Sequence, residues 1–171
     1  MPNSAANSEN WTDAFGAEKS IIARAFFSTD FGFDKYDQVF VPEFNWGAME
    51  NVGCVVLREE MLFSSPPSRK ELFGRDNTLV HELAHMWFGN LVTMDWWDDL
   101  WLNEAFATFM ATMCSDKFNP EWKRWNQFSL ERSMAFDVDS LENTRPIEFE
   151  VKSPVDAEGM FDLLTYEKLF L

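Results

Sequence analysis

Only two histidines occur in the 171 residues of the chain, and they lie four positions apart in the pentapeptide HELAH. An α-helix turns by about 100° per residue, so side chains at positions i and i+4 leave the same face of the helix. His81 and His85 can therefore bind one metal ion together, and Glu82 can reach a water molecule held by that ion. The pentapeptide also occurs by chance, and a helical histidine is more often an ordinary surface or core residue, so a metal site requires further ligands.

A third ligand is available in the segment WLNEAF, which contains Glu104. On one straight helix His85 and Glu104 would lie roughly 28 Å apart, because each residue adds about 1.5 Å. The sequence predicts a reversal between them, since Gly89 suits the left-handed end of one helix and Asp98 and Asp99 favour the start of the next. Two packed helices would then bring both histidines and the carboxylate to one point. A fourth zinc position would remain for water, as in catalytic rather than structural zinc sites.

The composition of the chain argues against some partners and compartments. With 29 acidic and 14 basic residues, the net charge is −15, which disfavours binding to nucleic acids or anionic membranes. No apolar run approaches the ~20 residues that span a membrane, and the first nine residues lack the pattern of a signal peptide, so we expect a cytoplasmic protein. Cys54 and Cys114 are too few for a disulfide framework and fit reduced thiols.

Periodicity and turn residues predict one α+β domain, in which a small β-sheet precedes a mostly helical part. We expect a disordered segment at 1–16 and strands at 38–42 and 53–58. Helices are expected at 17–29, 98–117, 120–136 and 158–171. A further helix carries the histidines; it begins somewhere between Ser68 and Asn77 and ends at Gly89. Residues 137–153 contain a proline and are expected to be irregular. Four tryptophans near the histidines are expected to pack in the core rather than to contact a substrate: Trp87, Trp96, Trp97 and Trp101.

Four sequence segments follow one another along the chain: GAMEN at 47–51, HELAH at 81–85, WFGNLVT at 87–93 and WWDDLWLNE at 96–104. Eighteen residues separate the second histidine from the glutamate that ends the last segment. This set resembles the zinc aminopeptidases of the alanyl aminopeptidase family, which are gluzincins with a gap of that length.

The resemblance extends from about Ile21 to Lys168 and implies that residues 17–171 form part of a thermolysin-like catalytic domain. Proteins of this kind are longer, so we expect N-terminal and C-terminal domains of a parent enzyme outside this chain. The resemblance also leaves open that the parent is a membrane-anchored ectoenzyme.

The resemblance implies a role for each matching residue near the metal. His81, His85 and Glu104 would bind one Zn²⁺, and a water bound to the metal would attack the scissile carbonyl group. Glu82 would be the general base. Tyr166 would stabilise the oxyanion, a contribution typically worth about 3 kcal/mol, although by itself this tyrosine would read as an ordinary helix aromatic.

The GAMEN segment would bind the substrate. Glu50 would hold the free α-ammonium group of a peptide, which would make the enzyme an aminopeptidase. Gly47 and Ala48 would pair with the peptide backbone as an added strand. Met49 would line the first side-chain pocket or fill the core, and Asn51 completes the segment. The implied partners are peptides with a free N-terminus, and the side-chain preference stays open.

Two positions depart from the family pattern. Ala111 stands where many members have an acidic residue that supports the metal ligands, and Leu169 stands where glycine is usual. Because the resemblance covers only part of a longer enzyme, an alternative stays open, a truncated and catalytically inactive zinc-binding fragment that dimerises or docks through an exposed aromatic surface. An epoxide hydrolase of the leukotriene hydrolase type is a lower-ranked alternative.

Overall fold

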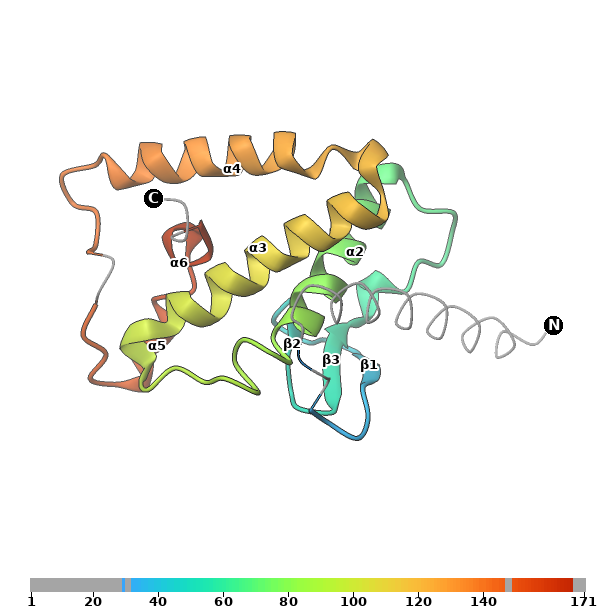
Figure 1. Cartoon of the computed structure of the whole chain (residues 1–171), viewed down its shortest axis with the longest axis horizontal. Helices are drawn as coiled ribbons and strands as arrows, with labels where there is room; N and C mark the ends of the chain where they lie inside the picture. Colours follow the sequence, from blue (N-terminus) through green and yellow to red (C-terminus); the bar gives the residue numbers. More distant parts are fainter. Residues whose placement is uncertain (1–28, 30–31, 147–148, 168–171) are drawn as a thin grey trace.

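The computed structural model describes residue 29 and residues 32–146 and 149–167 (Figure 1). It confirms the α+β class, because a three-stranded sheet is followed by a mostly helical part. The predicted disordered segment 1–16 and nearly all of the predicted helix 17–29 lie outside the described residues. The division of the chain after residue 16 therefore stays a prediction.

The sheet contains the strands β1 (Asp37–Val41), β2 (Ala48–Met49) and β3 (Cys54–Arg58) in the order β1-β3-β2. β1 runs parallel to β3, with Asp37 opposite Cys54, and β2 runs antiparallel to β3, with Ala48 opposite Leu57. The two longer strands agree with the prediction to within one residue at each end. β2 was not predicted, because two residues beside a glycine show no alternating pattern. It forms one edge of this sheet.

Helix α2 (Arg69–Ala84) begins at a capping box. The Ser68 hydroxyl accepts a hydrogen bond from the Glu71 backbone N–H at 3.2 Å, and Glu71 Oε2 accepts one from the Ser68 N–H at 2.7 Å. These bonds satisfy backbone donors that the first turn of a helix leaves free. The capping box thus fixes the first residue of α2 at Arg69, whereas apolar periodicity places the start of this helix only between Ser68 and Asn77.

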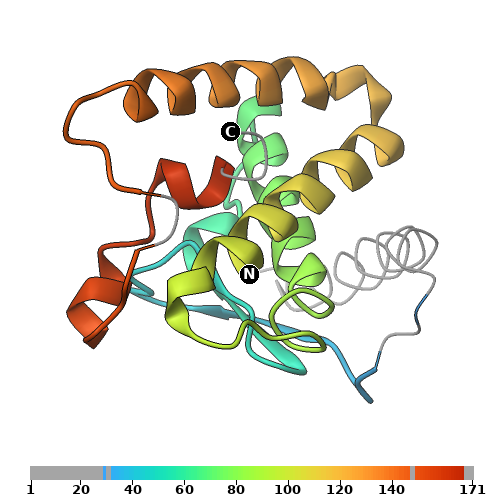
Figure 2. The ribbon, with the colours of Figure 1, turned by 60° about the vertical axis from the view of Figure 1, so that its left-hand side comes forward.

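α2 lies between the sheet and helix α3 (Leu100–Phe118), so it buries side chains on two sides (Figure 2). On the sheet side, Leu79 and Leu83 of α2 form one buried cluster with Val55 and Leu57 of β3. A helix that is buried on two sides shows no single apolar stripe, which explains why the sequence pattern placed this helix poorly.

Small side chains form much of the contact between α2 and α3. Val80 and Ala84 of α2 cluster with Ala107, Ala111 and Cys114 of α3. Ala107 and Ala111 have no exposed surface at all. Small residues at a helix contact let the two axes approach toward the lower end of the usual 8–10 Å. Side chains that flank this contact on the two helices can therefore meet.

The chain reverses between α2 and α3 as predicted, but α2 ends at Ala84 rather than at Gly89. Turns and one isolated β-bridge, between Phe88 and Val92, occupy residues 85–92. His85 still has helical angles, with φ −59° and ψ −21°, so it keeps its i+4 relation to the first histidine. Gly89 has φ +124°, and a β-carbon there would lie 2.2 Å from Asn103 Oδ1. A glycine is required at this point of the reversal.

The other helices of the described residues are η2 (Glu59–Met61), η3 (Trp97–Asp99), η4 (Pro120–Trp122), α4 (Arg124–Asp139), α5 (Pro154–Glu158) and α6 (Leu163–Glu167). The single helix predicted for 120–136 is wrong at both ends, because Lys123 has φ +51° and separates η4 from α4, and α4 continues to Asp139. Of the helix predicted for 158–171, the structure confirms only α6, because α5 ends at Glu158, residues 159–162 are not helical, and residues 168–171 lie outside the described residues. α6 contacts both α3 and α4 (Figure 1).

Replacement of Gly89 by alanine should lower the free energy of unfolding by about 2 kcal/mol or more, because the new methyl group would meet Asn103 and the positive φ disfavours alanine. The matched control is Gly74→Ala on an exposed face of α2, where a β-carbon would meet nothing within 4 Å. That change should stabilise the protein by about 0.5–1 kcal/mol. Urea unfolding measures both, and similar values for the two variants would contradict the prediction.

Candidate active site

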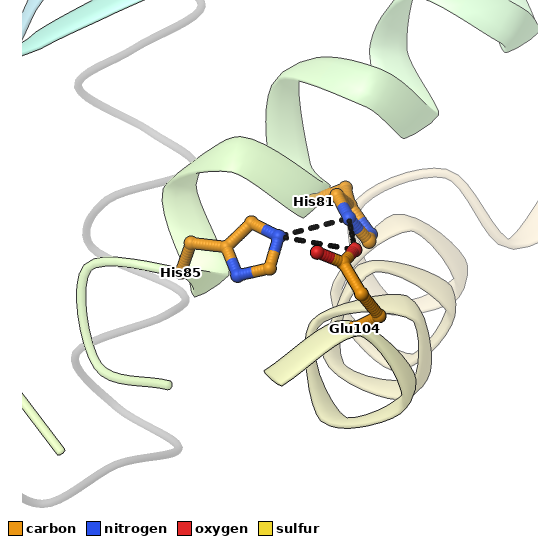
Figure 3. Close-up of side chains that lie close together, drawn as sticks. All are labelled: His81, His85 and Glu104. Atoms are coloured by element: carbon orange, nitrogen blue, oxygen red, sulfur yellow. Dashed lines mark hydrogen bonds and ion pairs between the residues drawn. The ribbon is translucent and has the colours of Figure 1, made fainter. Parts of the chain in front are cut away.

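The three predicted metal ligands converge at one point. His81 Nε2 lies 3.0 Å from His85 Nε2 and 3.2 Å from Glu104 Oε2, and His85 Nε2 lies 3.6 Å from the same oxygen (Figure 3). His81 lies in the last turn of α2, His85 is the C-cap residue that follows this helix, and the glutamate comes from the second turn of α3. Ligand atoms around a tetrahedral zinc ion, with bonds of about 2.0–2.2 Å, lie about 3.4 Å apart. This donor set fits one Zn²⁺ ion.

The far side of the His85 ring faces two hydrogen-bond acceptors. His85 Nδ1 lies 3.0 Å from the Phe88 carbonyl oxygen and 3.1 Å from Asn103 Oδ1. Nδ1 must carry a proton to donate to these oxygens, which leaves Nε2 as the nitrogen that faces the Glu104 carboxylate. Nε2 can hold a second proton there, or it can give its lone pair to a metal ion. The two oxygens thus orient the ring for either a proton or a cation between Nε2 and Glu104.

The electrostatics of the site favour positive charge. Burial alone would raise the pKa of Glu104, but hydrogen bonds with His81 and His85 outweigh burial and lower that pKa to about 2. Burial alone would lower the pKa of His85, but the hydrogen bond and charge of Glu104 raise it to about 9. For His81 burial is the larger effect, and its pKa falls. A buried carboxylate anion between imidazoles attracts either a proton or a divalent cation.

Glu82 and Tyr166 lie beside the three ligands. Glu82 on α2 is only 5% exposed, and burial raises the pKa of its carboxyl group to about 8. A carboxyl group that titrates near neutral pH is suited to accept and return a proton. Tyr166 reaches the site from α6, with its ring centre 5.9 Å from that of His81. Burial raises the pKa of Tyr166, so its hydroxyl group stays protonated and can donate a hydrogen bond.

A cleft of about 980 Å³ opens over these residues. From the GAMEN segment, Ala48, Met49 and Glu50 line the cleft, whereas Gly47 and Asn51 do not. Met49 is 41% exposed, so it faces the cleft rather than filling the core. The structure thus brings the middle of the segment to the site and leaves its two ends outside.

At the edge of β2 that faces away from β3, Ala48 has backbone groups that can pair with another strand, and this residue lines the cleft. The Arg58 backbone N–H donates to the Gly47 carbonyl oxygen at 3.1 Å, so this pair belongs to the hydrogen-bonded type of an antiparallel ladder. Ala48, which lies opposite Leu57, belongs to the alternate type, whose N–H and C=O groups point away from β3. Ala48 can therefore pair with an added strand, and the carbonyl group of Gly47 is already engaged in the sheet.

Glu50 follows β2 and lies next to the metal ligands. One of its carboxylate oxygens is within 4.8 Å of a Glu82 oxygen and of a His85 ring nitrogen. Glu50 Oε1 accepts a hydrogen bond from Asn103 Nδ2 at 3.3 Å, and the Glu50 carbonyl oxygen accepts one from Asn90 Nδ2 at 2.9 Å. Both asparagines lie in the sequence segments that carry the family resemblance, Asn90 in WFGNLVT and Asn103 in WWDDLWLNE. Their contacts with Glu50 could not be predicted, because a sequence segment does not show which group a side-chain amide contacts.

Two tryptophans that were expected in the core line the cleft instead. Trp96 is 58% exposed and Trp97 is 43% exposed. Trp96 Nε1 donates to the Val151 carbonyl oxygen at 3.1 Å, which holds the ring in place on the cleft wall. The expectation was correct for Trp87, which is buried. Aromatic residues pack both cores and ligand clefts, so residue type alone does not separate the two locations.

Thr108 makes a contact with His81 that the sequence analysis missed. Thr108 Oγ1 lies 3.4 Å from His81 Nδ1. Ala111, at the position where many family members are acidic, is buried in the same cluster as Val80 and offers no polar atom. Thr108 follows Glu104 by four residues and therefore shares its face of α3, a spacing that could have identified it.

An ion pair at the N-terminal end of α6 supports the position of Tyr166. Arg145 Nε donates to Asp162 Oδ2 at 2.9 Å, and Arg145 Nη2 donates to Asp162 Oδ1 at 2.5 Å. Asp162 Oδ1 also accepts a hydrogen bond from the Thr165 backbone N–H at 2.9 Å, in the manner of a helix N-cap. A two-bond arginine–carboxylate pair has a defined geometry, so it holds the helix that carries Tyr166.

Residues 15–170 match the Peptidase family M1 domain. The chain belongs to peptidase family M1. It is 43% identical to Aminopeptidase M1-D from Oryza sativa subsp. japonica over 157 residues, an alignment that covers 90% of this chain and 18% of the relative. It is 43% identical to Leucyl aminopeptidase from Saccharolobus solfataricus over 145 residues, or 84% of this chain and 18% of the relative. It is 44% identical to Aminopeptidase N from Streptomyces lividans over 145 residues, or 83% of this chain and 17% of the relative.

These matches confirm the resemblance that the sequence segments indicated. The chain spans less than a fifth of the length of these M1 relatives. Among the described residues, no helix is both long enough and apolar enough to cross a bilayer. The expected cytoplasmic location stays a prediction.

Replacement of Arg145 by alanine should lower the free energy of unfolding by about 1–2 kcal/mol at neutral pH, because it removes a two-bond ion pair with Asp162. The exposed Arg132→Ala on α4 is the matched control and should change stability by less than about 0.5 kcal/mol.

The effect of this Arg145 variant should also depend on pH. Burial alone would raise the pKa of Asp162, but the hydrogen bond with Arg145 outweighs it and lowers that pKa. Such a carboxylate stabilises the fold above its unfolded pKa of about 3.9 and loses that contribution as the pH falls through the folded pKa. The difference between wild type and variant should be full at about pH 7 and shrink below about pH 4 in urea unfolding. A difference that grows on acidification would contradict this assignment.

Proposed function

We propose that this chain forms the zinc centre and the substrate-ammonium site of an M1 aminopeptidase. The observation that carries the proposal is the convergence of His81, His85 and Glu104 with Glu82 buried beside them. Proteins that are 43–44% identical to the chain are named aminopeptidases. Because the chain spans only 17–18% of these relatives, the activity of the whole protein is part of the proposal.

The residues of the site divide the chemistry of peptide hydrolysis between them. Zinc, when bound, supplies a Lewis acid that polarises a carbonyl group and lowers the pKa of a coordinated water to about 7. Glu82 accepts the proton of the attacking water and returns it to the nitrogen of the leaving amine. Tyr166 donates its hydroxyl hydrogen to the carbonyl oxygen of the substrate, where negative charge develops.

Glu50 gives the proposed enzyme its preference for the end of a peptide. Within the part of the chain that the structure describes, its carboxylate accepts one hydrogen bond, from Asn103, so it keeps acceptor positions for an α-ammonium group. A bound ammonium group at Glu50 places the first carbonyl group of the peptide near the metal ligands, and an internal amide offers no such charge. The outward backbone groups of Ala48 pair with the peptide as an added strand. The proposed substrates are peptides with a free N-terminus.

One observation favours the alternative, a non-catalytic zinc-binding module that docks on a partner. Exposed apolar residues follow helical spacing along α4 and just beyond it: Leu130, Met134, Val138 and Leu141. Such a stripe is typical of a helix that contacts another surface. Sedimentation and apolar-dye binding separate the two proposals, since a compact monomer that binds no dye and hydrolyses peptides excludes the alternative.

Replacement of Glu82 by glutamine should abolish turnover and leave zinc bound, because the general base is not a ligand. Release of the chromophore from an aminoacyl p-nitroanilide should fall at least about 100-fold, and elemental analysis should find one zinc per chain, as in the wild type. The exposed Glu142→Gln is the matched control.

The same assay with and without a chelator tests the proposed function itself. The longest available protein that contains this sequence is measured beside the 171-residue chain. Stoichiometric zinc without chelator-sensitive release in the longer protein contradicts an aminopeptidase. Loss of zinc in Glu82→Gln contradicts the role of that residue as a base.

Replacement of Glu50 by alanine should raise KM for the aminoacyl p-nitroanilide roughly tenfold or more, because a charge-assisted hydrogen bond to the α-ammonium group is lost. Inhibition by an N-acetylated peptide, which carries no ammonium group, should not change. The exposed Glu59→Ala serves as the matched control. Equal losses for the free and the acetylated compounds would show that Glu50 does not bind the ammonium group.

A further inference from the structure

We propose that Asn103 is a positioning residue that holds a metal ligand and the ammonium-binding carboxylate at the same time. Zinc affinity and recognition of the free amine would then depend on one amide group. The second half of this inference rests on the proposed role of Glu50.

The two ends of the Asn103 amide contact different parts of the site. Its Oδ1 accepts a hydrogen bond from His85 Nδ1 at 3.1 Å, and its Nδ2 donates to Glu50 Oε1 at 3.3 Å. Nδ2 also lies 3.5 Å from Oε1 of the neighbouring Glu104. The residue is only 8% exposed, so water does not readily replace these partners. An acceptor on one side and donors on the other are what an amide side chain offers.

The backbone around Asn103 is shaped for this amide. Gly89 approaches it so closely that a β-carbon would lie 2.2 Å from Oδ1. Asn90, the next residue, donates from Nδ2 to the Glu50 carbonyl oxygen at 2.9 Å. The turn after α2 therefore leaves room for the Asn103 amide and also fixes the backbone of the residue whose carboxylate that amide binds.

Each contact has a separate consequence. The bond at Oδ1 keeps the proton of His85 on Nδ1 and orients the ring, so Nε2 is free to bind a cation. The bond at Nδ2 holds the Glu50 carboxylate at the cleft instead of letting it rotate into solvent. Loss of the whole amide should weaken both functions, and loss of only the donor end should weaken only the second.

The first arm of the test measures zinc affinity of the metal-free 171-residue chain by competition with a chelator. Asn103→Ala should bind zinc about 10–100-fold more weakly than wild type, the usual effect of removing a partner of a metal ligand. Asn103→Asp keeps an acceptor for His85 and should bind zinc at least as tightly as wild type. The exposed Asn126→Ala on α4 is the matched control and should equal wild type.

The second arm measures binding of alaninamide and of N-acetylalaninamide to the zinc-loaded chain. Both Asn103 variants should lose roughly tenfold in affinity for alaninamide, since Ala removes the donor and Asp adds a repelling carboxylate. Neither should change binding of the acetylated compound. In a Glu50→Ala background the Asn103→Ala change should cost less than about twofold, because its target carboxylate is gone.

The outcomes separate this inference from the proposed function. Zinc affinity of Asn103→Ala equal to that of Asn126→Ala overturns the inference, as does an alaninamide loss that persists in the Glu50→Ala background. Zinc-loaded wild type that does not prefer alaninamide over its acetylated form overturns the role of Glu50, and with it the second half. A wild type that passes both arms but hydrolyses no peptide contradicts the proposed function alone. Where Asn103→Ala does not fold, Asn103→Asp decides, because it must keep zinc and lose the amine preference.

Discussion

The packing of α2 on α3 through small side chains is the contact on which the site depends. Ala84 on one helix and Ala107 and Ala111 on the other are buried, and their size lets the two backbones approach. The two histidines and Glu104 flank this contact, and their ligand atoms come within 3.0–3.6 Å of one another. Metal sites tolerate only a few tenths of an ångström in such distances, so a bulkier residue between the helices would displace the ligands as well as overpack the core.

The same region buries several polar groups, which satisfy one another. His85, Asn103 and Glu104 are all buried, and their contacts link α2, α3 and the segment after β2 into one hydrogen-bond network. In a low-dielectric interior each of these groups would be costly without its partner. The proposed metal and ammonium sites therefore share supports. Burial also explains the raised pKa of Glu82, the group that the proposed function uses to carry a proton.

Local features were predictable where one short-range rule decided them. Helical spacing alone placed His81 beside His85, and β-branched runs located β1 and β3 to within one residue. The rules failed where a contact with another element decided the outcome. β2 is a strand because β3 lies beside it, and Trp96 is exposed because a cleft lies over it. The break at Lys123 depends on a positive φ that residue type does not announce.

By itself, the sequence determined the chemistry of the candidate site: two imidazoles at i and i+4, a glutamate beside the first, and segments that identify peptidase family M1. Such features are local or are carried by residue identity, so they can be read without coordinates. Only the tertiary structure decided that Glu104 meets the histidines, that Asn103 bonds both His85 and Glu50, and that Thr108 faces His81. Those contacts join residues from separate elements, and their distances follow from how closely the helices and the sheet edge pack.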